Sequence, residues 1–439
     1  MSASKIEIPL KVLIHKQEER VVLAETNSDF VDILFSFLTL PMGTIVRLLS
    51  SHVNASQPEA IGIFSNLYGS IANLEDTYFA SVACKDVLLN TRNSAEALCE
   101  KLKVNIDGDN PIDYFTCVDH NCTGYLSISR FVRCSKCSKL LNRRAYFHDT
   151  TSGDQQGVFV QPTASFIVMD DLHVIPNIPA LTLALVENSG VTDFGVLEEK
   201  TFQIGHTEIL DLLKYSILSK TPLTSTLLSK NYKKIDNSVQ LINNCMSTDQ
   251  GTISFKKMTV KLLVQKSNGT ILLAYSSRDF IDFLFSFITI PLGRFKSLIG
   301  TERIQKICWN AKYRAASGTF ISLAYHLTMY SSDDCGDREI KLASPLGEAG
   351  FLNVSTKYMV TDDLVVTPLS SISCVKYIHS CQIPPSDIEE QVVNIGMEEA
   401  LNLLRASLLS TSVLTNGLKH LIRTEPSKNT VMKKPKEDK

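Results

Sequence analysis

Four cysteines in two closely spaced pairs are the side chains of this sequence best suited to chemistry. The pairs are Cys117-x4-Cys122 and Cys134-x2-Cys137, and eleven residues separate them. Thiolate sulfurs are soft ligands, and two short loops that each supply two of them can surround a tetrahedral ion. The spacing therefore predicts a structural Zn²⁺ bound by Cys117, Cys122, Cys134 and Cys137.

Four thiolates around one divalent cation leave no open position for a catalytic water. We therefore expect this site to stabilise the fold and not to catalyse a reaction. The alternative interpretation is a redox Cys-x-x-Cys or a chance cluster. His120 lies inside the first pair as a substitute ligand, but it ranks below Cys122 because the four-cysteine set is already complete. Ser138 follows the second pair, at a position where zinc knuckles often have Gly.

The same segment is rich in cations and aromatic rings. Such a mixture could balance the negative charge of a metal–thiolate cluster, or it could contact phosphates and stack on bases. A zinc-dependent nucleic-acid-binding protein is therefore an alternative function, and its affinity should fall steeply with salt. The cations are Arg130, Arg133, Lys136, Lys139, Arg143 and Arg144, and the rings are Tyr125, Phe131, Tyr146 and Phe147.

Two pairs of neighbouring carboxylates could bind a divalent cation or act as acid and base. They are Asp170 with Asp171 and Asp362 with Asp363, and each pair follows a β-branched run. Aspartates in turns at strand ends are commoner, so we expect a turn at both places. An enzyme whose site lies between two halves of the chain is the further alternative. The sequence contains no P-loop, dinucleotide fingerprint, nucleophile elbow or His-Glu-x-x-His pattern, and we assign no catalytic and no cofactor-binding residue.

An internal repeat organises the elements that must position these residues. Phe30–Gly43 reads FVDILFSFLTLPMG and Phe280–Gly293 reads FIDFLFSFITIPLG, an offset of 250 residues. Each run predicts a mostly buried helix that ends before its proline. Its polar residues recur every three or four positions, which we interpret as a stripe that faces water or caps the helix, with a shared binding face as the alternative. The stripe comprises Asp29, Asp32, Ser36 and Thr39, repeated as Asp279, Asp282, Ser286 and Thr289.

Each copy of the repeat opens with a predicted β-hairpin. Leu10–Ile14 and Val21–Ala24 are apolar strand candidates, and Asn268 with Gly269 forms a hairpin signal at the same place in the second copy. Apolar spacing predicts further helices at Ile61–Leu74 and Ser94–Leu102, and closing helices at Glu208–Ser219 and Glu399–Ser410.

These blocks predict an α+β fold made of two tandem copies of one hairpin-plus-helices domain. We expect the first copy at residues 1–230, with a Cys-rich, zinc-ribbon-like insertion at about residues 105–155, and the second at residues 252–423. Residues 231–251 are rich in Asn, Ser and Lys and suit a linker, and the polar residues 424–439 suit a disordered tail.

The composition limits the classes of protein to consider. With 44 basic and 46 acidic residues, the whole chain has no strong field, so contact with nucleic acid or a membrane would need a local patch. No apolar run approaches the ~20 residues of a membrane span, and the N-terminus lacks the apolar core of a signal peptide. We expect a cytoplasmic protein, with the nucleus as the alternative because of the basic run Lys433–Lys436. In these compartments its 11 cysteines are reduced thiols or metal ligands.

Several of these blocks occur together in one known family. They are the hairpin at Lys11, Phe30–Gly43, Tyr114–Cys117, the pair Cys134 and Cys137, Val360–Leu364 and the helix at Leu401. On these motifs, nearly the whole chain resembles a plant-specific family of uncharacterised proteins known as domain of unknown function six-seven-four. The resemblance implies a plant origin, and it brings no established activity, substrate or catalytic residue.

The sequence favours a non-enzymatic role over an enzymatic one. A duplicated domain presents two similar surfaces, and the one site with distinctive spacing is closed to substrates. We therefore expect a zinc-stabilised scaffold that binds protein partners. Partner identity, substrate and oligomeric state leave no signal in the sequence.

Overall fold

The computed structural model describes most of the chain. The described residues are 6–52, 62–93, 95–108, 114–119, 122, 125–127, 129–134, 136–145, 158–162, 164–228, 257–294, 326–327, 340–342 and 350–422. The predicted linker at 231–251, the predicted tail at 424–439, and His120, Tyr146 and Phe147 lie outside the described residues.

The first of two large sheets is antiparallel, with the strand order β7-β6-β2-β1-β8. The predicted hairpin is confirmed as β1 and β2, because apolar residues alternate along β1 and place Ile8, Leu10, Val12 and Ile14 in the core. The strands are β1 (Ile8–His15), β2 (Arg20–Asn27), β6 (Ser165–Met169), β7 (Val174–Pro176) and β8 (Leu197–Ile204).

The second large sheet has the matching order β14-β13-β10-β9-β15 and is also antiparallel. Its strands β9 and β15 pair along their full lengths, as β1 and β8 do in the first sheet. Ile395 pairs with Met258 at one end of β15, as Ile204 pairs with Ile8 at one end of β8. The strands are β9 (Met258–Gln265), β10 (Ile271–Ser276), β13 (Tyr358–Thr361), β14 (Val366–Pro368) and β15 (Ile388–Ile395).

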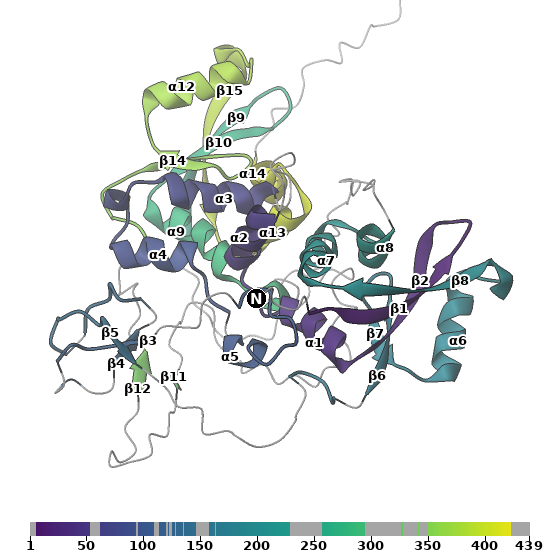
Figure 1. Ribbon diagram of the computed structural model, residues 1–439. Helices are drawn as coiled ribbons and strands as arrows, with labels where there is room; N and C mark the ends of the chain where they lie inside the picture. Colours follow the sequence, from purple (N-terminus) through teal and green to yellow (C-terminus); the bar gives the residue numbers. More distant parts are fainter. Residues whose placement is uncertain are drawn as a thin grey trace, which may run out of the picture.

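Helices cover both sheets, so the chain is a mixed α+β protein (Figure 1). Matching helices follow matching strands in the two halves of the chain. They are α1 (Ser28–Phe37) and α9 (Arg278–Ser286), α6 (Pro179–Asn188) and α12 (Ser371–Ser380), α7 (His206–Leu218) and α13 (Met397–Leu409), and α8 (Pro222–Leu227) and α14 (Val413–Leu418). Among the helices of the described segments, none combines the length and the apolar character that a membrane span requires.

Further helices lie between α1 and the Cys-rich segment. The predicted helix at Ile61–Leu74 is confirmed, whereas the prediction at Ser94–Leu102 yields only one short turn of helix. These helices are α2 (Met42–His52), α3 (Gly62–Asn73), α4 (Val82–Leu89) and α5 (Glu96–Cys99). The 3₁₀ turns are η1 (Asp76–Tyr78), η2 (Phe194–Val196), η3 (Phe287–Thr289), η5 (Pro385–Asp387) and η6 (Lys419–Leu421).

The polar stripe of the repeated helix does not face water in α1. Asp32 is 5% exposed and Ser36 is 3% exposed, so the expected solvated stripe is wrong at these positions. The Asp32 carboxylate accepts backbone N–H groups from residues 158–160 at 2.8–3.1 Å. In α9, Asp282 accepts the N–H groups of Phe351 and Leu352 at 3.2 and 3.0 Å. Each carboxylate thus fixes the loop that leads into the next strand of its sheet.

The two copies of the repeated segment pair with each other. Residues 38–42 and 290–293 run antiparallel, and their prolines, Pro41 and Pro291, form an isolated bridge. Backbone N–H groups donate in both directions across the contact. Met42 donates to Ile290 O at 3.1 Å, Leu292 to Leu40 O at 2.9 Å and Gly293 to Leu38 O at 2.8 Å.

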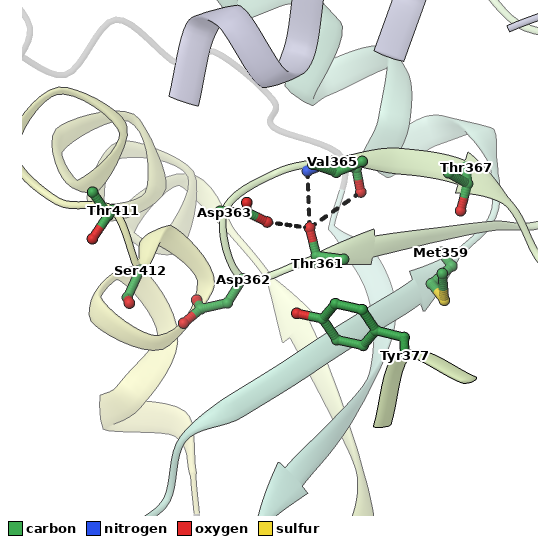
Figure 2. A pocket seen from close by; sticks show the side chains of 9 residues that line it. All are labelled: Met359, Thr361, Asp362, Asp363, Val365, Thr367, Tyr377, Thr411 and Ser412. Carbon is green, nitrogen blue, oxygen red and sulfur yellow. Dashed lines mark hydrogen bonds between the residues drawn. The ribbon is translucent and has the colours of Figure 1, made fainter. Parts of the chain in front are cut away.

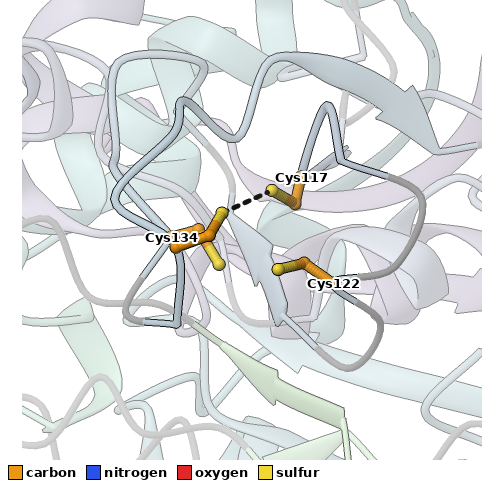
Figure 3. Close-up of side chains that lie close together, drawn as sticks. Cys117, Cys122 and Cys134 are labelled. Carbon is orange, nitrogen blue, oxygen red and sulfur yellow. Dashed lines mark hydrogen bonds between the residues drawn. The ribbon is translucent and has the colours of Figure 1, made fainter.

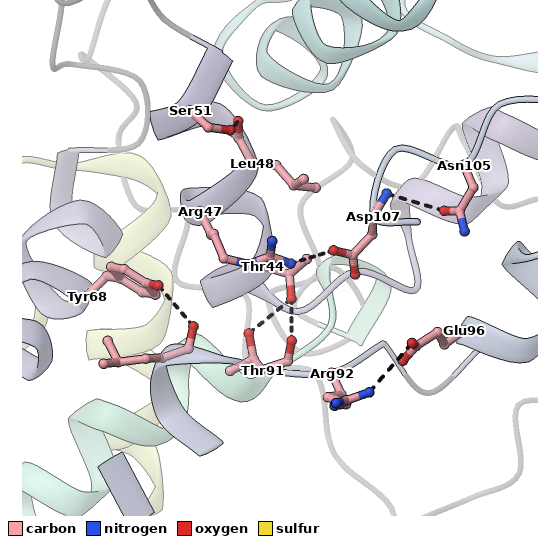
Figure 4. Close-up of polar contacts among 11 residues, drawn as sticks. Thr44, Arg47, Leu48, Ser51, Tyr68, Thr91, Arg92, Glu96, Asn105 and Asp107 are labelled. Atoms are coloured by element: carbon pink, nitrogen blue, oxygen red, sulfur yellow. Dashed lines mark hydrogen bonds and ion pairs between the residues drawn. The ribbon is translucent and has the colours of Figure 1, made fainter. Parts of the chain in front are cut away.

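Both glycines of the repeat lie where two backbones approach closely. A Cβ atom on Gly293 would lie 2.9 Å from Leu38 O, and one on Gly43 would lie 3.2 Å from Ile288 O and 2.8 Å from Thr91 Oγ1. The Thr44 hydroxyl holds Thr91 in place by donating to its carbonyl oxygen at 2.7 Å (Figure 4). The junction therefore leaves little room for a side chain at either glycine, and least at Gly293.

The α3 helix comes from the first half of the sequence but packs on the second sheet. It lies beside β14, α9 and α13 (Figure 1). Its Asn66 Nδ2 donates to Asp363 O at 2.9 Å, and its Ser70 Oγ accepts from Val366 N at 2.9 Å. Just beyond α3, Phe79 forms a bridge with Leu352. The two halves therefore share one apolar core.

Candidate metal centre

The four predicted cysteines lie at the ends of short strands in a third, small sheet. Cys117 directly follows β3 (Tyr114–Thr116), Cys122 precedes β4 (Tyr125–Ser127), and Cys134 and Cys137 lie before β5 (Arg143–Ala145). The sheet order is β11-β12-β4-β3-β5. Two short strands of the second half, β11 (His326–Leu327) and β12 (Ile340–Leu342), complete it, with β12 parallel to β4.

The four sulfur atoms converge, as their spacing predicted. All lie within 4.8 Å of one another, and the Cys117 and Cys137 sulfurs are 3.4 Å apart. Figure 3 shows Cys117, Cys122 and Cys134 directed toward a common centre. A disulfide would need about 2.05 Å between sulfurs. Four sulfurs on a tetrahedral ion at about 2.3 Å would be about 3.8 Å apart, so the observed set fits such an ion.

The second cysteine pair forms a tight turn. Cys134 N donates to Lys139 O and Ser138 N donates to Cys134 O, both at 2.8 Å. Ser138 has φ of 59°, the left-handed region that glycine enters most easily. A serine thus occupies a left-handed position in this turn, which glycine would adopt more easily.

Burial and hydrogen bonding separate the pKa values of the thiols. The backbone N–H of Lys139 donates to the Cys137 sulfur and lowers the pKa of that thiol to about 7. The hydrogen bond with Cys137, together with burial, raises the pKa of Cys122 to about 12. Burial also raises the pKa of Cys117. Without a cation, Cys137 is therefore the most readily ionised of these three thiols, and a bound divalent ion would favour the thiolate form of its ligands.

A small core joins this cluster to the rest of the protein. Cys117, Cys122 and Cys134 are buried with Ala83 of α4, Val132 and Leu141. Beside this core, Ser129 Oγ donates to Asp86 Oδ2 of α4 at 3.2 Å. The sequence did not single out Ala83 or Asp86, because nothing in the α4 pattern distinguishes this face from any other apolar helix face.

The six cations around the cysteines are all exposed, but they do not share one face. Arg143 and Arg144 are successive residues of β5, so their side chains leave opposite faces of the sheet. Lys139 Nζ lies 2.9 Å from Asp119 Oδ2, and Arg133 donates to Ser138 O at 3.0 Å. These contacts stabilise the turns that carry the cysteines, and they weaken the case for a nucleic-acid surface.

The two aspartate pairs form turns, as predicted, and each binds a helix of its own half. Asp170 accepts Thr224 N at 2.8 Å and Thr224 Oγ1 at 2.7 Å, at the start of α8. Asp362 accepts Thr415 N at 2.7 Å and Thr415 Oγ1 at 2.9 Å, at the start of α14. Two residues after each of these aspartates the backbone is left-handed, with φ of 64° at Leu172 and 62° at Leu364. These contacts give the first aspartate of each pair a structural role.

The comparisons with known proteins bear on the family. A family model described as a protein of unknown function (DUF674) matches residues 4–318 and 328–398. Searches of curated proteins and of solved structures found no match. The family match covers most of the chain and confirms the resemblance that the motifs indicated. The chain therefore belongs to the DUF674 family of proteins of unknown function.

Proposed function

We propose that Cys117, Cys122, Cys134 and Cys137 hold one structural Zn²⁺, and that the chain is a zinc-stabilised scaffold for protein partners. The observation that carries the metal assignment is the convergence of four sulfurs within 4.8 Å. Four sulfur ligands complete a tetrahedral shell, and three of the four cysteines are buried. Binding of structural Zn²⁺ contributes about 10–16 kcal/mol in zinc-finger peptides, enough to order strands of only three residues.

We also propose that the chain arose by duplication of one hairpin-plus-helices unit, with the zinc segment inserted into the first copy. The two large sheets have the same strand order, which supports the duplication. So do the paired contacts of Asp170 with Thr224 and of Asp362 with Thr415. Within this arrangement, α3 of the first copy completes the second.

A role in binding proteins is supported by two matching helices with exposed apolar side chains. Leu183 of α6 is 58% exposed, and Ile372 and Val375 of α12 are 70% and 66% exposed. The residues of α12 are three positions apart and lie on one helix face. An apolar helix face that stays in water is typical of a protein-interaction surface.

Metal analysis tests the site. Protein purified without added zinc should contain one equivalent of zinc, and the double variant Cys134→Ser, Cys137→Ser should contain almost none. Cys381→Ser is the matched control, because Cys381 is a free thiol far from the cluster in sequence. Zinc-free wild-type protein, or equal zinc in the double variant, would remove the assignment.

The scaffold is tested by affinity capture followed by binding of the purified candidate. Ile372→Glu with Val375→Glu should abolish binding, and Lys376→Glu on the same helix should preserve it. Binding that survives the double substitution would show that α12 is not the surface. Nucleic acid is the alternative partner, and affinity for it should fall steeply between ~50 and ~200 mM salt.

A further inference from the structure

An open cavity of about 410 Å³ lies beside the second aspartate pair. Figure 2 shows it between the turn that carries Asp362 and Asp363, Tyr377 of α12, and the residues that precede α14. Met359 and Val365 form apolar parts of the wall. The Tyr377 ring reaches across the opening, with its hydroxyl directed toward the side where Asp362 lies (Figure 2).

Apolar side chains occupy the same place in the first half. The matching strands and helices of the two halves align Thr361 with Met169, Thr367 with Ile175 and Tyr377 with Leu185. In the first half Met169 and Ile175 pack in a small core with Ile167 and Val186. The second half has hydroxyl groups at all three positions, and the Thr367 hydroxyl is buried without a hydrogen-bond partner in the described residues. The cavity has thus gained one hydroxyl group, that of Thr367, which the described residues do not satisfy.

The second half also has threonine at two positions where the first half has a cation. Burial raises the pKa of Asp170 to about 6, and the Arg20 guanidinium acts in the opposite direction. The residue that corresponds to Arg20 is Thr270, and the residue that corresponds to the exposed Lys220 is Thr411. Neither Asp362 nor Asp363 forms an ion pair within the part of the chain that the structure describes. Two adjacent carboxylates therefore face the cavity without a protein cation.

The carboxylates retain acceptor capacity. Asp362 accepts two hydrogen bonds from Thr415 and one from the Ser412 side chain, and Asp363 accepts from Thr361 and, at 3.2 Å, from Asn66. A carboxylate has about four acceptor positions, so each can accept more. A Ca²⁺ ion would require about six to eight oxygen ligands, more than these partly occupied groups offer. An ammonium group requires three acceptors, and its alkyl chain suits the walls formed by Met359 and Val365.

We propose that this cavity binds an alkyl ammonium compound of the diamine or polyamine class, with Asp362 and Asp363 accepting from the ammonium group and the Tyr377 ring lying against the alkyl chain. A second ammonium group at the open side would remain in water. The cavity is large enough for such a ligand, since small-molecule sites begin at about 300 Å³.

Isothermal titration calorimetry of the full zinc-loaded chain with spermidine at ~0.15 M salt tests this proposal. We expect binding to one site. Thr411→Lys restores the cation of the first half at an exposed position and should weaken binding about tenfold or more. Lys220→Thr removes that cation from the first half and is the matched control, with unchanged affinity expected.

A second variant distinguishes a loss of binding from a folding defect. Thr367→Ile with Tyr377→Leu restores the apolar residues of the first half, so it should fold normally by circular dichroism and lose spermidine binding. Absence of binding to wild-type protein, or equal affinity in Thr411→Lys, would overturn the proposal. So would a titration in which CaCl₂ binds more tightly than spermidine and competes with it, since the site would then be one for a divalent cation.

Discussion

Ser138 has a left-handed backbone at the turn that carries Cys134 and Cys137. An L residue in this region costs about 1–2 kcal/mol, and a β-branched residue is strained most. Ser138→Gly should therefore keep or slightly raise the thermal stability of the zinc-loaded protein, since the greater freedom of glycine in the unfolded chain offsets part of the gain. Ser138→Val should lower the free energy of unfolding by more than about 1 kcal/mol. Equal melting temperatures for the two variants would show that the turn does not impose this backbone.

Asp282 makes stability depend on pH. Burial raises its pKa from 3.8 to about 7, so the folded state keeps a proton that the unfolded state releases between these values. The wild-type free energy of unfolding should therefore fall as pH rises from 4 to 7, relative to Asp282→Asn, by at most about 1.4 kcal/mol per pH unit. Above pH 7 the two curves should run parallel. Urea unfolding across this range measures the difference, and curves that are parallel throughout would contradict the prediction.

Individual residues differ in how far the sequence could predict them. The spacing of the cysteines was sufficient to predict that their sulfurs converge, because two short loops that each carry two sulfurs can readily bring them to one centre. The partners of Asp32 were not predictable, because its carboxylate binds backbone groups 126–128 residues away and their side chains leave no pattern. The cavity beside Tyr377 had a signal, namely the polar residues that replace Met169, Ile175 and Leu185, but it appears only when the halves are compared.

At the scale of elements, local sequence patterns predicted the strands and helices themselves better than the elements against which they pack. The alternation in Leu10–Ile14 and the apolar spacing in Ile61–Leu74 correspond to β1 and α3. Neither pattern indicates that α3 packs on the sheet of the other half, because an amphipathic helix shows which of its faces is buried and not what covers that face. Ser94–Leu102 gave only α5, because the backbone after Glu100 continues in tighter turns, in which Lys101 N donates to Leu98 O and Leu102 N donates to Cys99 O.

The junction of the repeated segments depends on backbone proximity. Gly293→Ala would place a Cβ atom 2.9 Å from Leu38 O, and backbone oxygen cannot move away cheaply. We expect a loss of about 1–3 kcal/mol in the free energy of unfolding. Gly69→Ala in α3 is the control, because its Cβ would meet no atom within 4 Å and alanine favours the helix by up to about 1 kcal/mol. A Gly293→Ala protein as stable as wild type would show that the junction is not close-packed.

At the scale of the whole molecule, the two halves are expected to fold as one unit. The α3 helix buries Ile63, Phe64, Leu67 and Ile71, and it packs on β14, η3, α9 and α13 of the second half as well as on α2 and α4. Chains of residues 1–230 and 252–423 produced separately should therefore be unstable, and together they should form a stable complex. Co-purification and hydrogen exchange on the separate and joined chains measure this. Two independently folded, non-associating fragments would contradict it.

The account depends most on the ion at the four sulfurs, and zinc-edge X-ray absorption of the purified full chain tests it directly. We predict one zinc per chain with four sulfur neighbours at about 2.3 Å and no oxygen or nitrogen in the shell. In the variant Cys134→Ser, Cys137→Ser this signal should disappear, and in Cys381→Ser it should be unchanged. A shell containing nitrogen or oxygen, or a wild-type protein without zinc, would contradict the central claim.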